Sequence, residues 1–507
     1  MSRDGRSEAS LGHPEQRHTD SRHPERSEGS AVSPSRRGFL RTLAGSALAA
    51  SPIGALACRA AVRTSPSPTG ARGWDLVPEI LARIVPPTFP SRDFEITRFG
   101  AVGDGAMDST AAIRRAIDAC AAAGGGHVVV PEGRFLTGAV HLKSNVNFHV
   151  ARGATLAFSR APRHYLPAVL TRFEGTELMN YSPFLYAYEQ DNIAITGEGT
   201  LDGQADRTHW WPWKGSADFG WERGAPNYNT ARQRLLDMAE RGTPVARRVF
   251  GEGDYLRPNF IQPYRCRNVL IENVTIIGSP MWEIHPVLCR NVTVHGVTIV
   301  SHGPNNDGCD PESCRDVLID RCVFDTGDDC IAIKSGRNAD GRRVNVPSEN
   351  IIVRGCEMRD GHGGVTVGSE ISGGCWNVFA YDCRMDSPRL DRVLRLKNNA
   401  MRGGLLEHIY MRDVTVGQVA DSILSIDFFY EEGDKGPFTP VARDIELHRV
   451  TSRKSPYALY LRGFPNAPID DVRVIDCHFA DVAKGSVVEH VSRLDQRGTT
   501  VNGAPVR

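Results

Sequence analysis

Apolar side chains recur between residues 268 and 477 in a short pattern that is present in eight copies. Each copy starts with a polar residue, and apolar residues follow one, three and six positions later. Apolar residues at alternate positions are typical of a β-strand with one buried face, and the last apolar position follows a bend. The polar starting residues are Asn268, Asn291, Asp316, Asn350, Asn377, His408, Asp444 and Asp471.

The starting residues of successive copies lie 23, 25, 34, 27, 31, 36 and 27 residues apart. Equal strands at unequal intervals predict rungs of fixed length that are joined by loops of variable length. Stacking of equivalent positions buries a continuous core that no single repeat forms alone. A β-propeller fits poorly, because its blades need ~40–50 residues, and a leucine-rich solenoid has a Leu/Asn pattern that this chain lacks. The repeat therefore predicts an all-β fold, a parallel β-helix.

One helix is predicted ahead of these strands. Residues 109–123 carry Ala and Ile at helical spacing, with Asp108 or Ser109 as the N-cap. The glycines at 124–126 follow this helix and lack the Gly-Lys-Ser/Thr ending of a phosphate loop, so we interpret them as a helix stop. Strands are expected on both sides, within 94–105 and 127–131. A single short helix before many strands is best explained as an N-terminal cap on the strand stack.

The first 60 residues are predicted to be an N-terminal extension and an export signal. Residues 35–41, Ser-Arg-Arg-Gly-Phe-Leu-Arg, resemble a twin-arginine motif, and 42–57 is an apolar run that ends in small residues. This run is too short to span a bilayer comfortably, so we expect no transmembrane helix. Cys58 follows directly and is a candidate for a lipid anchor. The predicted location is the periplasm, the cell surface or the surrounding medium.

The rest of the chain is divided by composition. Residues 61–90 are rich in Pro and Ser and are predicted to be a linker. The β-helix domain is expected over 91–490, with a C-terminal tail over 491–507. Between 201 and 260 the repeat is interrupted by an insertion with four Trp, at positions 210, 211, 213 and 221. Aromatic rings of such an insertion either stack on sugar rings or pack within the loop, and the sequence favours neither.

Charge and cysteine usage narrow the function classes. Sixty Lys and Arg balance 60 Asp and Glu, which argues against a nucleic-acid-binding protein, because such a protein needs a concentrated positive surface. Cysteines occupy the repeat position that Val takes in other copies, which predicts small, buried apolar side chains. No cysteine pair has the C-x2-C spacing of a zinc site. Disulfides are compatible with export, but spacing gives no connectivity. The cysteines at this repeat position are Cys322, Cys356, Cys383 and Cys477.

Four short motifs carry candidate chemistry. Asp329 follows Asp307 by 22 residues, and the steps from Asp329 to His362 and from His362 to Arg395 are 33 residues each. Such steps match coils of a β-helix, whose adjacent strands lie ~4.8 Å apart. We therefore predict that the motifs meet on one face. They are Asn305-Asn306-Asp307-Gly308, Gly327-Asp328-Asp329-Cys330, Gly361-His362-Gly363 and Arg395-Leu396-Lys397.

The residue types in these motifs favour hydrolysis of an acidic sugar. Clustered carboxylates repel one another, which raises the pKa of at least one and keeps it protonated near neutral pH. An acid beside bases is what glycosidic hydrolysis requires. Asp328 and Asp329 can both act only if Gly327 marks a bend, because neighbours on a strand point to opposite faces. Arg395 and Lys397 share a face and are predicted to bind a substrate carboxylate.

With these motifs the chain resembles a polygalacturonase-type glycoside hydrolase of family 28, whose members degrade pectin and fold as a right-handed single-stranded parallel β-helix. The resemblance covers roughly residues 94–487 and rests on the family's Asn-Thr-Asp, Gly/Gln-Asp-Asp, Gly-His-Gly and Arg-Ile-Lys motifs. It implies hydrolysis of α-1,4-galacturonosidic bonds in pectin or polygalacturonate with inversion at the anomeric carbon. Long insertions resemble those of exo-acting members, in which a loop closes one end of the substrate cleft.

The resemblance also implies residue roles and the absence of a metal or other cofactor. Asp328 would be the general acid, Asp307 and Asp329 would activate the attacking water, His362 would support the acid, Arg395 and Lys397 would bind the galacturonate carboxylate, and Asn305 would be a further substrate-binding residue.

The chain departs from the family pattern at three positions. Asn306 replaces the usual Thr, and we expect it to tune the surroundings of Asp307. Leu396 replaces Ile and is expected to face the core. Fungal members pair the Cys after Asp-Asp with a Cys before Gly-His-Gly; residue 360 is Asp here, so Cys330 lacks that partner.

Three other functions remain open at this point. A rhamnogalacturonan or xylogalacturonan hydrolase shares the resemblance, although Arg395 and Lys397 favour galacturonate over neutral sugars. A polysaccharide lyase on the same fold needs an Arg or Lys base and usually calcium, and the three Asp argue against it. A non-catalytic carbohydrate-binding β-helix, such as an adhesin or a tailspike-like module, has no need for all four motifs.

Overall fold

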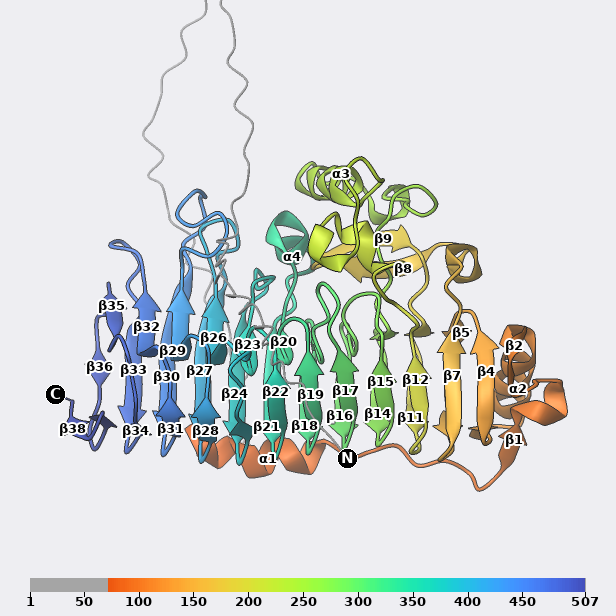
Figure 1. Ribbon diagram of the computed structural model, residues 1–507, viewed down its shortest axis with the longest axis horizontal. Helices are drawn as coiled ribbons and strands as arrows, with labels where there is room; N and C mark the ends of the chain where they lie inside the picture. The colour runs from red at the N-terminus through yellow and green to blue at the C-terminus, as the bar shows by residue number, and fades with distance from the viewer. Residues whose placement is uncertain (1–71, 507) are drawn as a thin grey trace, which may run out of the picture. The chain divides into compact units, whose positions relative to one another are not determined.

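The computed structural model describes residues 72–506, which lie within one compact unit, Pro66–Arg507. The predicted twin-arginine signal and Cys58 lie outside the described residues. Successive strands stack along one axis in coils (Figure 1). Among residues 72–506, no helix is long and apolar enough to cross a membrane.

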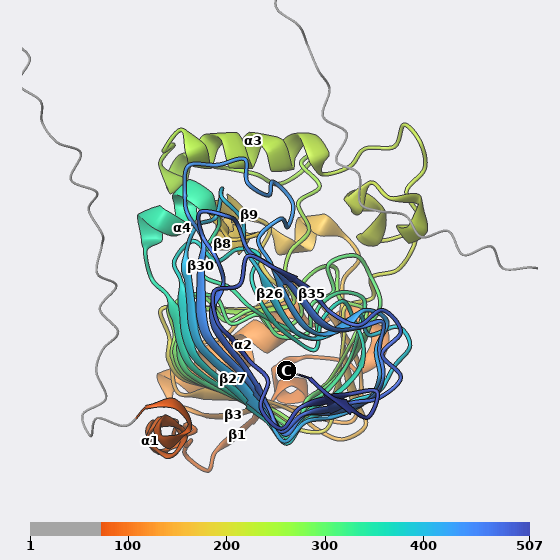
Figure 2. The same cartoon turned by 90° about the vertical axis from the view of Figure 1, so that its left-hand side faces the viewer.

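The coils form three faces, which enclose the core (Figure 2). The first face is a 13-stranded sheet and the second a 14-stranded sheet. The third face consists of a 3-stranded and a 6-stranded sheet. Isolated β-bridges connect these two sheets, and they run from Ile261 through Ile284 and Cys309 to Ile331. Strands of successive coils pair in parallel, as β14, β16 and β18 do. The predicted right-handed parallel β-helix is confirmed.

The strands of the three faces have the following bounds. The first face holds β1 (Asp93–Glu95), β3 (Gly126–Val130), β6 (Val146–Val150), β11 (Asp191–Thr196), β14 (Arg267–Glu272), β16 (Arg290–His295), β18 (Arg315–Asp320), β21 (Ser348–Arg354), β24 (Cys375–Tyr381), β27 (Leu405–Arg412), β30 (Val441–His448), β33 (Asp470–Ile475) and β36 (Leu494–Asp495). The second holds β2 (Asp104–Asp108), β4 (Gly133–Thr137), β7 (Ala154–Phe158), β12 (Thr200–Asp202), β15 (Thr275–Ile277), β17 (Thr298–Ser301), β19 (Val323–Thr326), β22 (Glu357–Asp360), β25 (Arg384–Met385), β28 (Thr415–Gln418), β31 (Thr451–Lys454), β34 (His478–Phe479), β37 (Thr500–Val501) and β38 (Ala504–Pro505). The third holds β5 (Val140–His141), β10 (Leu185–Tyr188), β13 (Ile261–Tyr264), β20 (Ile331–Ile333), β23 (Val365–Val367), β26 (Arg392–Lys397), β29 (Ser422–Asp427), β32 (Tyr457–Arg462) and β35 (Val487–Glu489).

The polar residue that starts each sequence repeat has a left-handed backbone. Its φ lies between 54° and 59° in all eight copies, a conformation that Asn and Asp adopt more readily than most other residues. The amides also form a ladder across the coils: Asn291 Nδ2 donates to Asn268 Oδ1 over 2.8 Å, and Asn377 Nδ2 donates to Asn350 Oδ1 over 3.0 Å. The polar position is thus set by backbone geometry, while the apolar positions that follow it are buried.

The cysteines behave as the repeat predicts. Those that replace Val, at 322, 356, 383 and 477, are buried in the main core. All eleven cysteines among residues 72–506 are buried and free. A thiol at these positions fills the volume of a small apolar side chain.

The predicted N-terminal cap is α2 (Thr110–Ala122), which lies at the end of the stack (Figure 1). Its apolar face, with Ile113, Ala116 and Ile117, is buried against the core. Asp108 accepts a hydrogen bond from the Thr110 amide over 2.9 Å, whereas Ser109 caps no amide with its side chain. Of the two predicted N-cap residues, Ser109 therefore occupies the N-cap position, while Asp108, one residue earlier, supplies the side-chain hydrogen bond.

Two predicted boundaries are wrong. Part of the expected linker, 61–90, forms α1 (Leu76–Arg83), whose Val77 and Ile80 pack on the outside of the first face against Ile352 and Phe379. The Pro content of this segment hid apolar residues at helical spacing. The expected tail, 491–507, contains β36, β37 and β38, and β36 and β37 extend the first two faces by parallel pairing. The β-helix therefore continues beyond residue 490.

The insertions gather on one side of the coil stack (Figures 1 and 2). They comprise the hairpin of β8 (Val169–Phe173) and β9 (Thr176–Asn180), α3 (Asn229–Glu240) and α4 (Asn338–Val344). Trp210 is buried and packs edge to face against Tyr165 and Trp213, with ring centroids 5.5 and 4.8 Å away. For this part of the Trp-rich insertion the structure favours internal packing over sugar stacking.

Candidate active site

The three predicted aspartates meet in one place. Asp307, Asp328 and Asp329 each place a carboxylate oxygen within 4.8 Å of the others. β19 ends at Thr326 and the next strand starts at Ile331, so residues 327–330 form a turn. The bend predicted at Gly327 is present, and it allows both neighbouring aspartates to face the cluster.

Asp328 pairs with His362, and together they hold one proton. His362 Nδ1 lies 3.1 Å from Asp328 Oδ1, and Asn305 Nδ2 donates weakly to Asp328 Oδ2 over 3.5 Å. Burial tends to raise the pKa of Asp328, but the charge and hydrogen bond of His362 outweigh burial and lower this pKa. The Asp328 charge and the same hydrogen bond raise the pKa of His362 to about 9. Near neutral pH the shared proton is therefore on the imidazole.

Asp329 is fully buried and held by three donors. Lys397 Nζ lies 2.7 Å from Oδ2, Arg395 lies 3.4 Å from Oδ1, and the Thr366 hydroxyl donates to Oδ1 over 3.0 Å. Burial opposes ionisation, but Lys397 and Arg395 prevail and lower the pKa of Asp329. The two cations that the sequence assigned to the substrate thus also hold a carboxylate of the protein. The Tyr430 ring lies over them, with its centroid 5.2 Å from Lys397 Nζ.

Asp307 is the member of the cluster whose pKa is raised. Burial and the nearby Asp328 charge raise its pKa well above the usual value, although Lys334 Nζ lies 3.3 Å from Oδ2. The sequence predicts that at least one carboxyl pKa in this cluster is raised. The raised pKa belongs to Asp307, whereas the residue predicted as general acid, Asp328, has a lowered one. This difference arises because His362 supplies both a charge and a hydrogen bond to Asp328, whereas at Asp307 burial and the charges of Asp328 and Asp329 outweigh Lys334.

The turn that carries Asp307 is fixed from both sides. Asn306 Oδ1 accepts hydrogen bonds from the Gly303 amide over 2.7 Å and the Ser301 hydroxyl over 2.8 Å. Buried Arg257 donates to Asn305 Oδ1 over 2.8 Å. Asn306 therefore supports the turn, as expected of the residue in the usual Thr position. Leu396 is fully buried, as predicted.

Several residues at the site were not predicted from the sequence. Lys334 follows the apolar strand β20, and a charged residue at the end of a buried strand was a usable signal. Thr366, Arg257 and Tyr430 lie outside the four motifs and carry no spacing signal of their own.

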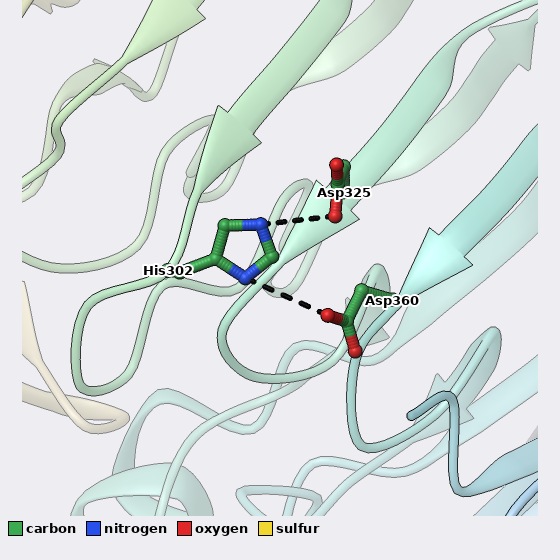
Figure 3. A group of neighbouring side chains, drawn as sticks. All are labelled: His302, Asp325 and Asp360. Atoms are coloured by element: carbon green, nitrogen blue, oxygen red, sulfur yellow. Dashed lines mark ion pairs between the residues drawn. The ribbon is translucent and has the colours of Figure 1, made fainter. Parts of the chain in front are cut away.

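A second cluster, formed by His302, Asp325 and Asp360, connects the segments that lead into the first three motifs. The His302 ring lies between two carboxylates, with Nε2 2.9 Å from Asp325 and Nδ1 3.7 Å from Asp360 (Figure 3). In the sequence these residues lie three, two and one positions before the first three motifs, respectively. Their ligand atoms are close enough for a metal ion, but the ring uses both nitrogens and Arg389 pairs with Asp360 over 3.0 Å. The contacts fit a cross-link between turns better than a metal centre.

Comparisons with known proteins agree with this geometry. The model of the family "Glycosyl hydrolases family 28" matches residues 251–492, which include all seven predicted site residues. A model of "Rhamnogalacturonase A/epimerase, pectate lyase-like" matches residues 94–150, which include none of them.

Three relatives are similar over most of the described chain. An exopolygalacturonase from Thermotoga maritima has 46% identity and a TM-score of 0.83, and the match covers 85% of this chain and 96% of that one. A probable polygalacturonase from Vitis vinifera is 27% identical over 76% of this chain and 74% of its own length. An exo-poly-alpha-D-galacturonosidase from Dickeya chrysanthemi is 28% identical over 67% of this chain and 57% of its own length.

Proposed function

This chain belongs to glycosyl hydrolases family 28, and from that premise we propose that it hydrolyses α-1,4-galacturonosidic bonds of pectin or polygalacturonate. The observation that carries this proposal is the convergence of Asp307, Asp328 and Asp329 beside His362. Two cations, Arg395 and Lys397, complete the same site. The relatives named for polygalacturonase activity support the same substrate class.

Asp328 is the proposed general acid, with its proton delivered by His362. In the free enzyme this proton is on the imidazole, 3.1 Å from the carboxylate. His362 is half exposed and Asp328 is partly exposed, so an arriving sugar displaces water from both. Loss of water disfavours separated charges, and the proton then moves to Asp328, where it can be donated to the leaving glycosidic oxygen.

Asp329 and Asp307 are proposed to activate the attacking water. Asp329 is ionised and accepts from Lys397, Arg395 and Thr366, and these donors reduce its strength as a direct nucleophile. We therefore propose attack by water, with inversion at the anomeric carbon. Carboxyl groups of inverting enzymes usually lie ~6.5–9.5 Å apart, and the aspartates here are closer, so the anomer of the first product is the measurement that decides this point.

Arg395 and Lys397 are the proposed partners of the galacturonate carboxylate, with Asn305 as a further substrate contact. Arg395 keeps part of its guanidinium exposed while it pairs with Asp329. A guanidinium has five N–H donors in a planar fork, so one carboxylate of the protein does not exhaust it. A neutral sugar would leave these donors unused, which favours galacturonate over rhamnogalacturonan or xylogalacturonan substrates.

We propose exo action and export as further parts of the function. The hairpin of β8 and β9, α3 and α4 stand on one side of the coils (Figure 1), where such insertions can close one end of the substrate path. The exopolygalacturonase from Thermotoga maritima, at 46% identity, supports exo action. The twin-arginine motif of residues 35–41 supports export, which brings the enzyme to a polymer outside the cell.

The test is incubation of the purified protein with polygalacturonate. We expect new reducing ends without unsaturated uronide, galacturonate monomer as the product by chromatography, and the inverted anomer in proton NMR spectra of the first minutes. Unsaturated product would replace this proposal by the lyase alternative. Oligomers at early times would contradict exo action, and the retained anomer would contradict the water-attack step.

The Asp328→Asn variant tests the assignment of the acid. Loss of a general acid lowers kcat by about 10²–10⁴-fold, while circular dichroism and polygalacturonate binding are expected to persist. Asp202→Asn is the matched control, because Asp202 pairs with Arg134 away from the cluster. Unchanged activity of Asp328→Asn would overturn the assignment.

A further inference from the structure

A buried set of charges lies behind Asp307. Lys334 Nζ is 3.3 Å from Asp307 Oδ2, 3.9 Å from Asp310 Oδ2 and 3.5 Å from Glu370 Oε2. It also lies 4.3 Å from the centroid of the Trp282 ring. Lys334 and Asp310 are at most 2% exposed, so this ammonium is shared among carboxyl groups out of contact with solvent.

The carboxyl groups around Asp307 have few other partners. Within residues 72–506, neither oxygen of Glu283 or Asp310 has a hydrogen-bond donor, and Asp307 Oδ1 has none. Glu283 and Asp310 are fully buried. An ionised carboxylate in such surroundings is costly unless a cation compensates it. Lys334 supplies that cation directly to Asp307.

We propose that Lys334 is a positioning residue that fixes the Asp307 carboxylate and keeps it able to accept a proton from the attacking water. This inference rests on the proposed function, in which Asp307 helps to activate that water. Asp329 already has Lys397 and Arg395 as its own cations. Lys334 thus supplies a cation to Asp307, as Lys397 and Arg395 do to Asp329.

Lys334 also connects Asp307 to the insertion. Glu370, which it contacts, pairs with Arg337 over 3.4 Å, and Arg337 pairs with Glu174 over 3.5 Å. Glu174 lies in the turn between β8 and β9. One chain of buried charges therefore runs from the hairpin to the catalytic cluster, and Lys334 is its last member before Asp307.

The sign of the effect on Asp307 follows from its neighbours. Burial and the charges of Asp328 and Asp329 raise its pKa, and Lys334 and Lys397 lower it. Removal of Lys334 therefore raises this pKa further, and the acidic limb of the activity profile moves to higher pH. Asp310 shares the Lys334 ammonium with Asp307, so its replacement by Asn leaves more of that charge to Asp307 and is expected to move the limb to lower pH. The charged and titratable groups that face Asp307 are Asp328, Asp329, Lys334, Lys397, Asp310 and Glu283.

The experiment compares Lys334→Met, Lys334→Arg and Asp310→Asn with wild type in the full chain. We expect Lys334→Met to move the acidic limb of kcat/KM on polygalacturonate up by about one pH unit or more, which is about a 10-fold loss below the limb. The loss is expected in kcat, with KM within about twofold, and Lys334→Arg is expected to restore the limb. Arg248→Met is the matched control, because it breaks a buried ion pair with Asp340 that does not contact the cluster.

A second readout does not need activity. Carbon-13 NMR of aspartate-labelled protein follows the Asp307 carboxyl, identified by its loss in Asp307→Asn, and we expect it to titrate at higher pH in Lys334→Met. If wild type does not hydrolyse polygalacturonate, the proposed function fails while this titration still tests Lys334. An Asp307 titration or acidic limb that matches Arg248→Met would overturn the inference. If Lys334→Met does not fold, Asp310→Asn decides alone: a limb that stays or moves to higher pH would overturn it.

Discussion

The candidate active site contains three carboxyl groups and one imidazole, and these four groups differ in how readily each holds a proton. The cations beside Asp329 keep it ionised, burial and the neighbouring charges raise the pKa of Asp307, and Asp328 and His362 hold one proton between them. An acid and a base are therefore present together at neutral pH, which general acid–base catalysis requires. The three carboxyl groups are chemically alike, so their different pKa values come from burial and from the charged side chains beside each of them.

His362 is expected to set the alkaline limit of activity. A histidine whose pKa is raised keeps its proton below that pKa and loses it as the pH rises through the value, here about 9. Above this pH the pair has no proton for the leaving group, so kcat/KM falls. In His362→Ala the proton must reside on Asp328 alone, which holds it less tightly than the pair does, and the alkaline limb is expected to move down by at least about one pH unit.

The measurement is the pH profile of kcat/KM on polygalacturonate for the wild type and for His362→Ala. His302→Ala is a matched control, because His302 also contacts two carboxylates, but these are Asp325 and Asp360 rather than the aspartates of the site. Its profile is expected to coincide with that of the wild type. An unmoved alkaline limb in His362→Ala would show that the imidazole does not supply the proton.

For single residues, the sequence predicts which side chains meet at the site better than it predicts their pKa values. The motif spacing brought Asp307, Asp328, Asp329 and His362 together, because each step spans whole coils. Which aspartate has the raised pKa depends on burial and on the charges that surround it, and neither is encoded in local spacing.

At the scale of single elements, the left-handed residue at the start of each repeat is a structural requirement. Asn350 has φ 59°, donates to Asp316 over 3.1 Å and accepts from Asn377 over 3.0 Å. Asn350→Ala loses both bonds and adds a left-handed Ala, for which we expect a loss of about 2–4 kcal/mol in the free energy of unfolding. Asn350→Gly loses the bonds but tolerates the backbone, so we expect it to be about 1 kcal/mol less destabilising than Ala.

Urea denaturation of the two Asn350 variants tests this ranking. Val85→Ala serves as the control, because the Val85 side chain is 62% exposed and its truncation removes little buried surface. Equal midpoints for the Ala and Gly variants would mean that the backbone conformation contributes nothing, and that the ladder hydrogen bonds account for the polar position.

The elements that repeat could be predicted, and those that do not repeat could not. The eight strands of the repeat were visible because each uses the same slots. The helix α1 occurs once and covers an outer surface, so its apolar residues had no equivalent copy for comparison. The last coil has strands of two residues, β36 and β37, which are too short for a period to appear.

At the scale of the whole molecule, the coil stack separates stability from chemistry. Core positions repeat from coil to coil, whereas the motifs occupy turns next to the third face and, for Arg395-Leu396-Lys397, the strand β26 itself, over a few neighbouring coils. Insertions such as the hairpin of β8 and β9 leave the pairing of the coils intact, since β10 still pairs with β13. The fold can therefore vary its loops around a fixed site.

The cysteines give a test of how the stack is held together. Cys266, Cys289 and Cys314 follow one another in adjacent coils, and their thiols donate to the backbone carbonyls of Tyr264, Val287 and Glu312, respectively, rather than bonding to one another. Packing and backbone pairing thus hold the coils without cross-links among residues 72–506. We expect a reductant to change the Tm of the full chain by no more than about 1 °C, because a disulfide would contribute about 2–4 kcal/mol.

The reactivity of the thiols distinguishes free, buried cysteines from cysteines that form disulfides. A buried thiol reacts poorly, because the thiolate is the reactive form and an apolar environment disfavours it; burial raises the pKa of Cys309 and Cys375. Ellman's reagent is therefore expected to find almost no reactive thiol in the native protein and at least the eleven described cysteines after denaturation without reductant. A smaller number in the denatured chain, together with a Tm that falls on reduction, would mean that neighbouring coils are cross-linked in the isolated protein. Cys266, Cys289 and Cys314 would then cross-link the coils rather than fill the core as small apolar side chains.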